Sequence, residues 1–336
     1  MKFRLVPVVG ALVVLAAVLG VGYYWGSWDS SQAAEAAVIT SEQEKEFTVL
    51  DAYKAGMKRL WEEGPEAADQ YLDQEMKTFG DLKILYGKAH VAYTKGKYED
   101  AEETLQYILA HENEPLLHAM SNYSLGLIRN VTGNQEEALV HLGKAYEYFD
   151  EEGHLPNVYR CLLEMVKSHI LSDEISLASS YLDRAFSVQK ATGINLGTFY
   201  GYKSHLAFMG REYGESREFF RRSLKEFREI NNLPSIANTL TSLALLEIMH
   251  GNFDVGKKLT DESMEIATDL VVEVEERSAY SKINLILLGK CNKDRDYGYL
   301  NMITEVNNHA DKVGDENLKE LLDIVVNWDC SNKEKK

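Results

Sequence analysis

The sequence predicts an all-α chain, a right-handed superhelix (α-solenoid) of antiparallel helix hairpins that follows one N-terminal transmembrane helix. An uncharged apolar run opens the chain, and a set of small residues recurs at steps of 37 to 40 residues. Only 5 prolines interrupt 336 residues, and 45% of the residues are hydrophobic. So few prolines in so apolar a chain favour long helices around a sizeable core.

Residues 1–28 have the composition of a membrane anchor. Lys2 and Arg4 precede a 20-residue uncharged run, residues 5–24, which is about the length that crosses a bilayer core of roughly 30 Å. An aromatic belt follows, made of Tyr23, Tyr24, Trp25 and Trp28. This pattern predicts a cytoplasmic N-terminus and an extracytoplasmic body. The alternative is a cleaved signal peptide, because the small residues of the 34–36 segment offer a cleavage site.

The next elements are predicted from capping signals and helical periodicity. Residues 29–40 predict a short polar tether, and residues 41–328 predict the solenoid itself. Ser41 is the expected N-cap of a first hairpin formed by residues 41–61 and 65–79, with Glu44 closing a capping box. Near the C-terminus, residues 275–290 and 297–313 predict another hairpin and residues 317–328 a capping helix. Residues 329–336 predict a disordered tail.

An internal repeat carries the prediction for the middle of the chain. Residues 85–109 read as a helix, a turn and a second helix, with a small residue early in the second helix. That small position recurs as Ala101, Ala138, Ala178, Ser216 and Gly256, and small or medium residues stand twelve positions before each as Ala89, Gly126, Val166, Ser204 and Ala244. Antiparallel helices cross closely only where side chains are small, so the two columns should face each other. One hairpin cannot bury both of its faces, so the hairpins should stack.

The turn between the two helices of each unit also recurs. The turn positions are Gly96, Gly133, Asp173, Arg211 and Gly251. This pattern resembles the tetratricopeptide repeat. The shared features are a small residue in the first helix, glycine and an aromatic residue at the turn, and alanine early in the second helix. The resemblance is clearest over residues 82–270. The repeats are longer than the usual 34 residues, like those of kinesin light chains and bacterial regulatory solenoids, and the N-terminal run resembles that of single-pass, membrane-anchored envelope tetratricopeptide proteins.

Charge and motifs exclude several function classes. The chain carries 36 basic and 53 acidic residues, a formal charge of −17, so electrostatic repulsion argues against a nucleic acid partner. It contains no H-E-x-x-H, G-x-S-x-G, Walker or C-x-x-C motif, which predicts a protein that is not an enzyme and uses no metal or cofactor. Among the three cysteines, Cys161 is predicted to be buried, while Cys291 and Cys330 can pair if the compartment is oxidising.

The resemblance implies that the first helix of each repeat lines a concave groove. Twenty positions at the second, fifth, ninth and twelfth places of five repeats should face it, and none of them is a carboxylate. The predicted binding residues are Lys83, Tyr86, His90, Tyr93, Tyr123, Asn130, Arg160, Lys167, His205, Phe208 and Asn238. A basic, aromatic groove in an acidic shell predicts an extended peptide or protein partner with acidic character.

The sequence therefore predicts a membrane-anchored scaffold or assembly factor that binds protein partners on the extracytoplasmic side, in the periplasm if the source is bacterial. Two alternatives remain open at this stage. One is a peptide-sensing regulatory receptor. The other is a soluble secreted repeat protein, released after signal cleavage.

Overall fold

The computed structural model describes residues 41–268, 274–291, 299–313 and 316–327. Within these ranges the chain is helical, with no strand. The predicted anchor (1–28), tether (29–40) and tail (329–336) lie outside the described residues. None of the described helices has the length and apolar character needed to span a bilayer.

The helices follow one another with short connections. In chain order they are α2 (Ser41–Glu62), α3 (Pro65–Phe79), α4 (Leu82–Thr94), α5 (Tyr98–His111), α6 (Pro115–Val131), α7 (Gln135–Glu151), α8 (Leu155–Leu171), α9 (Ile175–Thr192), α10 (Gly197–Met209), α11 (Tyr213–Glu229), α12 (Leu233–Met249), α13 (Phe253–Thr268), α14 (Val274–Cys291), α15 (Tyr299–Val313) and α16 (Glu316–Asn327). Each packs against the next, which makes a continuous stack of hairpins. The prediction of an all-α solenoid is confirmed.

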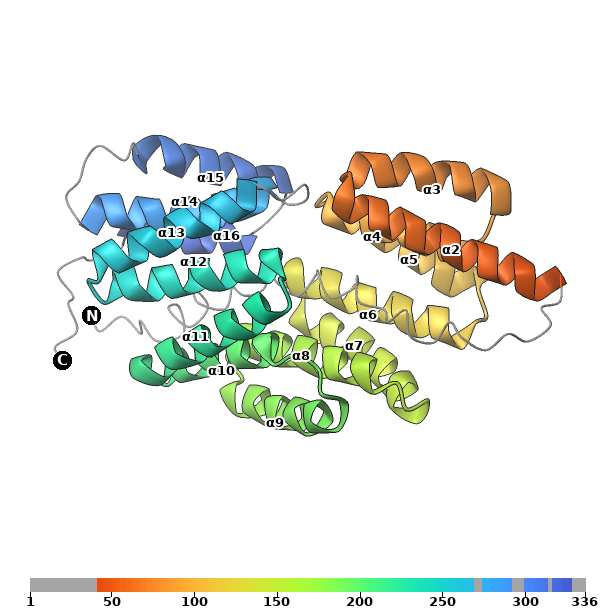
Figure 1. Cartoon of the computed structure of the whole chain (residues 1–336), viewed down its shortest axis with the longest axis horizontal. Helices are drawn as coiled ribbons and strands as arrows, with labels where there is room; N and C mark the ends of the chain where they lie inside the picture. The colour runs from red at the N-terminus through yellow and green to blue at the C-terminus, as the bar shows by residue number, and fades with distance from the viewer. Residues whose placement is uncertain (1–40, 269–273, 292–298, 314–315, 328–336) are drawn as a thin grey trace.

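The stack curves into an arc. Figure 1 shows α2–α5 and α12–α16 as two arms on opposite sides, joined through α6–α11. The first helices of neighbouring hairpins contact one another along most of the stack, whereas successive second helices do not make comparable contact. The contacting first helices are α2 with α4, α4 with α6, α6 with α8, α8 with α10 and α12 with α14. The first helices therefore lie on the shorter, inner side of the arc.

The facing columns of small residues set the distance between the two helices of each hairpin. Ala138 is fully buried, and a Cβ atom on Gly126 would lie only 2.6 Å from Cγ of Leu142. A Cβ atom on Gly256 would likewise lie 2.4 Å from Cγ1 of Ile248. Approaches this close leave no room for a larger side chain. The predicted register of the two columns is confirmed.

The turn column has a common backbone conformation. Gly96, Gly133 and Gly251 have φ of 70°, 84° and 81°, and the equivalent Asp173 and Arg211 have φ of 59° and 63°. This left-handed conformation is accessible to glycine at no steric cost and is unfavourable for other residues. The backbone of every repeat turn is thus the same even where the glycine is absent.

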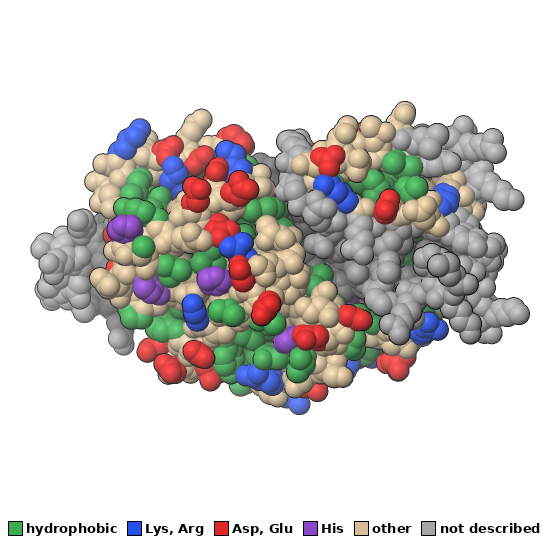
Figure 2. Space-filling model, turned by 180° about the vertical axis from the view of Figure 1, so that it is seen from behind, with side chains coloured by type: hydrophobic (Ala, Val, Ile, Leu, Met, Phe, Trp, Pro, Cys, Tyr) green, Lys and Arg blue, Asp and Glu red, His purple; other side chains and the backbone are tan. Residues whose placement is uncertain are grey.

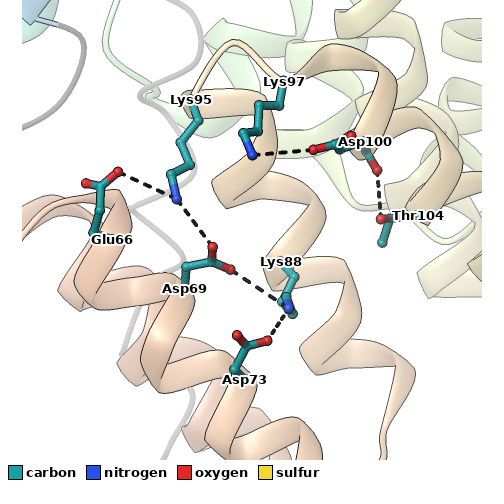
Figure 3. A network of polar contacts seen from close by, with 8 residues as sticks. All are labelled: Glu66, Asp69, Asp73, Lys88, Lys95, Lys97, Asp100 and Thr104. Atoms are coloured by element: carbon teal, nitrogen blue, oxygen red, sulfur yellow. Dashed lines mark hydrogen bonds and ion pairs between the residues drawn. The ribbon is translucent and has the colours of Figure 1, made fainter.

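Ion pairs join the first two hairpins across α3 and α4. The Nζ atom of Lys95 lies 3.6 Å from Oε1 of Glu66 and 3.3 Å from Oδ2 of Asp69, and Lys88 pairs with Asp69 and Asp73 (Figure 3). Acidic and basic side chains also intermingle on the face of the described residues that Figure 2 shows. Local pairing therefore neutralises part of the acidic charge, and the excess of acidic residues gives the net charge of −17.

The cysteines are in two different states. Cys161 is a buried free thiol on α8, as predicted, and burial raises its pKa. Cys291, at the end of α14, is disulfide-bonded. Cys330, its expected partner, lies outside the described residues.

Candidate functional site: the inner wall of the solenoid

The inner wall begins with a group of tyrosines on α2, α4 and α6. The ring centroids of Tyr53 and Tyr86 lie 6.1 Å apart, and Tyr93 packs against the buried clusters that contain Tyr86 and Tyr123. Tyr86 and Tyr123 are only 2% and 5% exposed. The hydroxyl of Tyr86 is 3.0 Å from Oγ of Ser124. The structure thus brings the three predicted tyrosines together across two adjacent hairpins.

The middle of the wall is a buried polar network on α6 and α8. Asn130 donates to the backbone oxygen of Glu164 at 3.2 Å and to its carboxylate at 3.3 Å, and it accepts a hydrogen bond of 2.7 Å from Ser168. The Nζ atom of Lys167 lies 3.9 Å from the same carboxylate. Burial raises the pKa of Glu164, and the Lys167 charge and the Asn130 hydrogen bond oppose that rise.

Glu164 corrects one expectation. The groove was predicted to be free of carboxylates, but Glu164 is fully buried beside two of the predicted groove residues. It lies between the positions assigned to the groove, so periodicity did not select it. Its occurrence inside an otherwise apolar run of α8 was the available signal, because an ionisable residue in such a run is retained only with partners.

Beyond α8 the wall carries polar atoms that lack partners. Among the described residues, neither ring nitrogen of His205, nor the hydroxyl of Tyr202, nor Nδ2 of Asn238 makes a hydrogen bond. The side chains of His205 and Tyr202 are at most 1% exposed and that of Asn238 is 6% exposed. A buried polar group without a hydrogen bond costs about 1–3 kcal/mol. These four atoms, on three side chains, therefore offer an unfilled hydrogen-bonding capacity to a ligand.

The inner wall is interrupted next to these atoms. Unlike the other neighbouring first helices, α10 and α12 make weak contact at most. A cavity of about 30 Å³ lies there, lined by Thr198, Gly201, Tyr202, Phe220, Ser223, Phe227, Ser235, Asn238, Thr239 and Ser242. Glycine on α10 and small hydroxyl residues on α12 leave this space, which is large enough for one or two water molecules or a small polar group.

The other predicted residues occupy less open positions. Lys83 is half-buried and pairs with Glu114 at 3.0 Å. Phe208 packs edge to face against Tyr213 in the core between hairpins, and Arg160 is half-buried near Tyr123. Asn130 is fully buried within the network described above. Only Lys83, Tyr93 and Arg160 of the eleven predicted residues are not buried.

The chemistry of the wall is that of recognition by hydrogen bonds and rings. Burial lowers the pKa of His90 to about 4 and that of His205 to about 3, so both are neutral near pH 7. Within the described ranges, no group of three histidine, cysteine or acidic side chains is arranged to hold a metal ion. Sequence periodicity missed Tyr53 because α2 precedes the five repeats from which the groove positions were taken. It missed Tyr202 because this residue directly follows Gly201 and lies between the fifth and ninth places of its repeat.

Comparison with known proteins agrees with this geometry. Residues 4–151 match the family model described as a tetratricopeptide repeat-like domain. The fold is that of a tetratricopeptide-like repeat protein. No curated protein sequence matches the chain.

Three solved structures share this tetratricopeptide-like fold. A Rap protein complexed with Competence and Sporulation Factor has a TM-score of 0.69 at 12% identity and covers 87% of this chain and 82% of its own. NprR in complex with its cognate peptide NprX has a TM-score of 0.62 at 18% identity, covering 82% and 79%. The apo quorum sensor NprR from B. thuringiensis has a TM-score of 0.54 at 15% identity, covering 88% and 89%. At these identities the likeness concerns the fold.

Proposed function

We propose that the chain is a scaffold that binds an extended peptide segment of a protein partner along its inner wall. The observation that carries this proposal is the set of buried polar atoms without hydrogen bonds on Tyr202 and Asn238, which line the cavity between α10 and α12, and on His205 of α10. A peptide side chain or backbone group placed there would supply the missing hydrogen bonds. The tyrosines of α2, α4 and α6 would supply aromatic contact area, which dominates many binding sites.

The scaffold is proposed to be anchored by residues 1–28 with its solenoid on the extracytoplasmic side. The uncharged run and its aromatic flank support the anchor. The disulfide at Cys291 supports an oxidising compartment, because such bonds are rare where thiols are kept reduced. The partner is proposed to have acidic character and to approach the wall toward the half-buried Arg160, near Tyr123.

A peptide-sensing receptor is the second candidate. The likeness of fold to a Rap protein and to NprR, both solved with a bound factor or peptide, favours it. In that case the ligand is a free short peptide. In the scaffold it is a segment of a larger protein.

Gly201→Ala tests the site with little disturbance of the fold. A Cβ atom there would meet only Oγ of Ser223, at the ordinary contact distance of 3.7 Å, yet it would occupy part of the cavity. Gly214→Ala is the matched control, because a Cβ atom at this helical glycine of the same hairpin meets nothing within 4 Å. A photo-crosslinking amino acid at Thr198, in native membranes, should capture one extended segment.

Mass spectrometry of the crosslinked product then identifies the ligand. We expect capture to fall at least several-fold in Gly201→Ala and to persist in Gly214→Ala. A crosslinker at the exposed Glu103 should not capture the same segment. Equal capture from both positions, or from both glycine variants, would overturn the inner-wall site. A free short peptide as the product favours the receptor, and a segment of a larger protein favours the scaffold.

A further inference from the structure

A continuous row of aromatic rings crosses three helices away from the unpartnered atoms of the inner wall. Phe186 of α9 stacks on Phe199 of α10 with centroids 4.9 Å apart. Phe199 meets its neighbour Tyr200 edge to face at 5.5 Å, and Tyr200 stacks on Phe219 of α11 at 6.3 Å. Phe199 is buried, and the other three rings are half-buried. The row therefore presents ring faces and edges at the surface.

Three exposed cations cover this row. The Nζ atom of Lys190 lies 4.4 Å from the centroid of Phe186, and that of Lys203 lies 4.9 Å from Phe219. The guanidinium of Arg222 lies 5.7 Å from Phe219. All three distances are within the range of favourable cation–π contact. Each cation is thereby held at a defined place while its outward N–H groups still face water.

The charge of this patch differs from that of the whole molecule. Acidic residues outnumber basic ones by 53 to 36 in the chain. Many of the described basic side chains form ion pairs, such as those of Lys88, Lys95, Arg129 and Arg228. Among the described residues, however, no carboxylate forms an ion pair with Lys190 or Lys203, and Arg222 pairs with Glu218. The patch therefore keeps uncompensated positive charge beside an apolar surface.

We propose that Lys190, Lys203 and Arg222, with the rings of Phe186, Tyr200 and Phe219, form a second docking surface for an acidic segment of a protein partner. Carboxylates of the segment would accept charge-assisted hydrogen bonds from the cations. Its apolar or aromatic side chains would pack on the half-buried rings between them. Charge complementarity selects this partner, because a basic segment would be repelled and a neutral one would leave the cations unpaired.

The surface is separate from the inner wall. On α10, Tyr200 and Lys203 take part in the row, whereas His205, fully buried, packs edge to face against Phe220. A partner held at the row thus leaves the cavity between α10 and α12 available. The two sites can fail independently in experiments.

The test uses the full-length chain in detergent and a fluorescent, glutamate-rich peptide carrying two tryptophans. The patch variant combines Lys190→Ser, Lys203→Ser and Arg222→Ser. The control variant combines Lys54→Ser, Lys144→Ser and Lys258→Ser, three exposed lysines on other helices. Removing three positive charges takes the formal charge from −17 to −20 in both variants. Any loss of peptide binding that comes only from the change in net charge is therefore the same in the patch and control variants.

Fluorescence anisotropy should give a Kd raised about tenfold in the patch variant, the usual effect of losing charged anchors, and nearly unchanged in the control. Tyr200→Leu with Phe219→Leu should also weaken binding while helicity, followed by circular dichroism, stays constant. Equal Kd values for the patch and control variants would overturn the proposal. Equally tight binding of a peptide in which lysine replaces glutamate would also overturn it. Binding of anionic lipid vesicles without binding of the peptide would overturn it as well.

Discussion

At the scale of single residues, one part of the solenoid's interior is a buried network of hydrogen-bonded polar groups. Asn130 connects α6 to α8 by hydrogen bonds with Glu164 and Ser168, and all three side chains are fully buried. Such a network is stable only while each member keeps its partners. Removing one of these polar side chains should therefore destabilise the inner wall, because its hydrogen-bond partners would be left buried without it.

Asn130→Ala should lower the free energy of unfolding by about 1–3 kcal/mol, because it leaves the Ser168 hydroxyl and the Glu164 carboxylate with fewer partners in the interior. Chemical denaturation followed by circular dichroism measures the change. Asn157→Ala, at a half-buried position in the first turn of α8, is the control and should have little effect. A cost for Asn130→Ala no larger than the control's would mean that the network contributes nothing.

The buried histidines predict a pH dependence. Because burial lowers the pKa of His90 to about 4 and of His205 to about 3, each binds a proton more readily in the unfolded chain. The free energy of unfolding should have its full value above pH about 6.5. It should fall as the pH drops toward the two folded-state pKa values, by up to roughly 1.4 kcal/mol per pH unit for each histidine. His205→Gln should flatten the fall in thermal stability between pH 6.5 and 4 relative to the wild type. An unchanged slope would contradict this prediction.

At the scale of the hairpin, the repeat turn imposes its conformation on whatever residue occupies it. Asp173 and Arg211 adopt a positive φ, like the glycines of the other repeats. The conformation costs a non-glycine residue about 1–2 kcal/mol. Sequence variation at the turn is therefore tolerated at the expense of stability.

Arg211→Gly should raise the free energy of unfolding by roughly 0.5–1 kcal/mol, since relief of backbone strain exceeds the greater freedom of glycine in the unfolded chain. Gly133→Ala should lower the free energy of unfolding by about 1 kcal/mol, even though no atom lies within 4 Å of the added Cβ. Melting temperatures of the two variants test both signs. If Arg211→Gly destabilises the protein, the Arg211 side chain makes a contribution that outweighs the strain.

At the scale of the whole molecule, the chain combines an acidic helical body with an N-terminal run of membrane length. The full-length protein should stay in the membrane pellet through alkaline carbonate extraction, because a 20-residue uncharged segment is stable across the bilayer core. Deleting residues 1–28 should release a folded helical body. A soluble mature protein beginning near Ala37 would instead identify the run as a cleaved signal peptide.

The compartment can be tested through Cys291. If the body lies in an oxidising compartment, Cys291 should resist alkylation in intact membranes until a reductant is added, while Cys161 stays protected by burial. Mass spectrometry after differential alkylation distinguishes the two cysteines. A Cys291 that is freely alkylated without reductant would contradict the proposed extracytoplasmic location.

Much of the fold follows from local patterns that the sequence contains by itself. The spacing of small residues at Ala101, Ala138, Ala178, Ser216 and Gly256 predicts hairpins, because close helix crossings need small side chains at fixed intervals. The first hairpin, predicted at residues 41–61 and 65–79, corresponds to α2 and α3 with one residue added to α2. The last predicted hairpin corresponds to α14 and α15 within two residues. These features depend on neighbours within one or two repeats, which periodicity records.

The character of the inner wall depended on tertiary structure. Periodicity placed Tyr86, Tyr93 and Tyr123 on one face, but it could not show that Glu164 is buried against Asn130 and Lys167. Nor could it locate the weak junction between α10 and α12, where Gly201 and small hydroxyl residues of the next repeat line a cavity. The row from Lys190 to Arg222 likewise joins three helices. Such contacts depend on how far each hairpin rotates against the next, and that rotation is decided by the packing of side chains distant in the sequence.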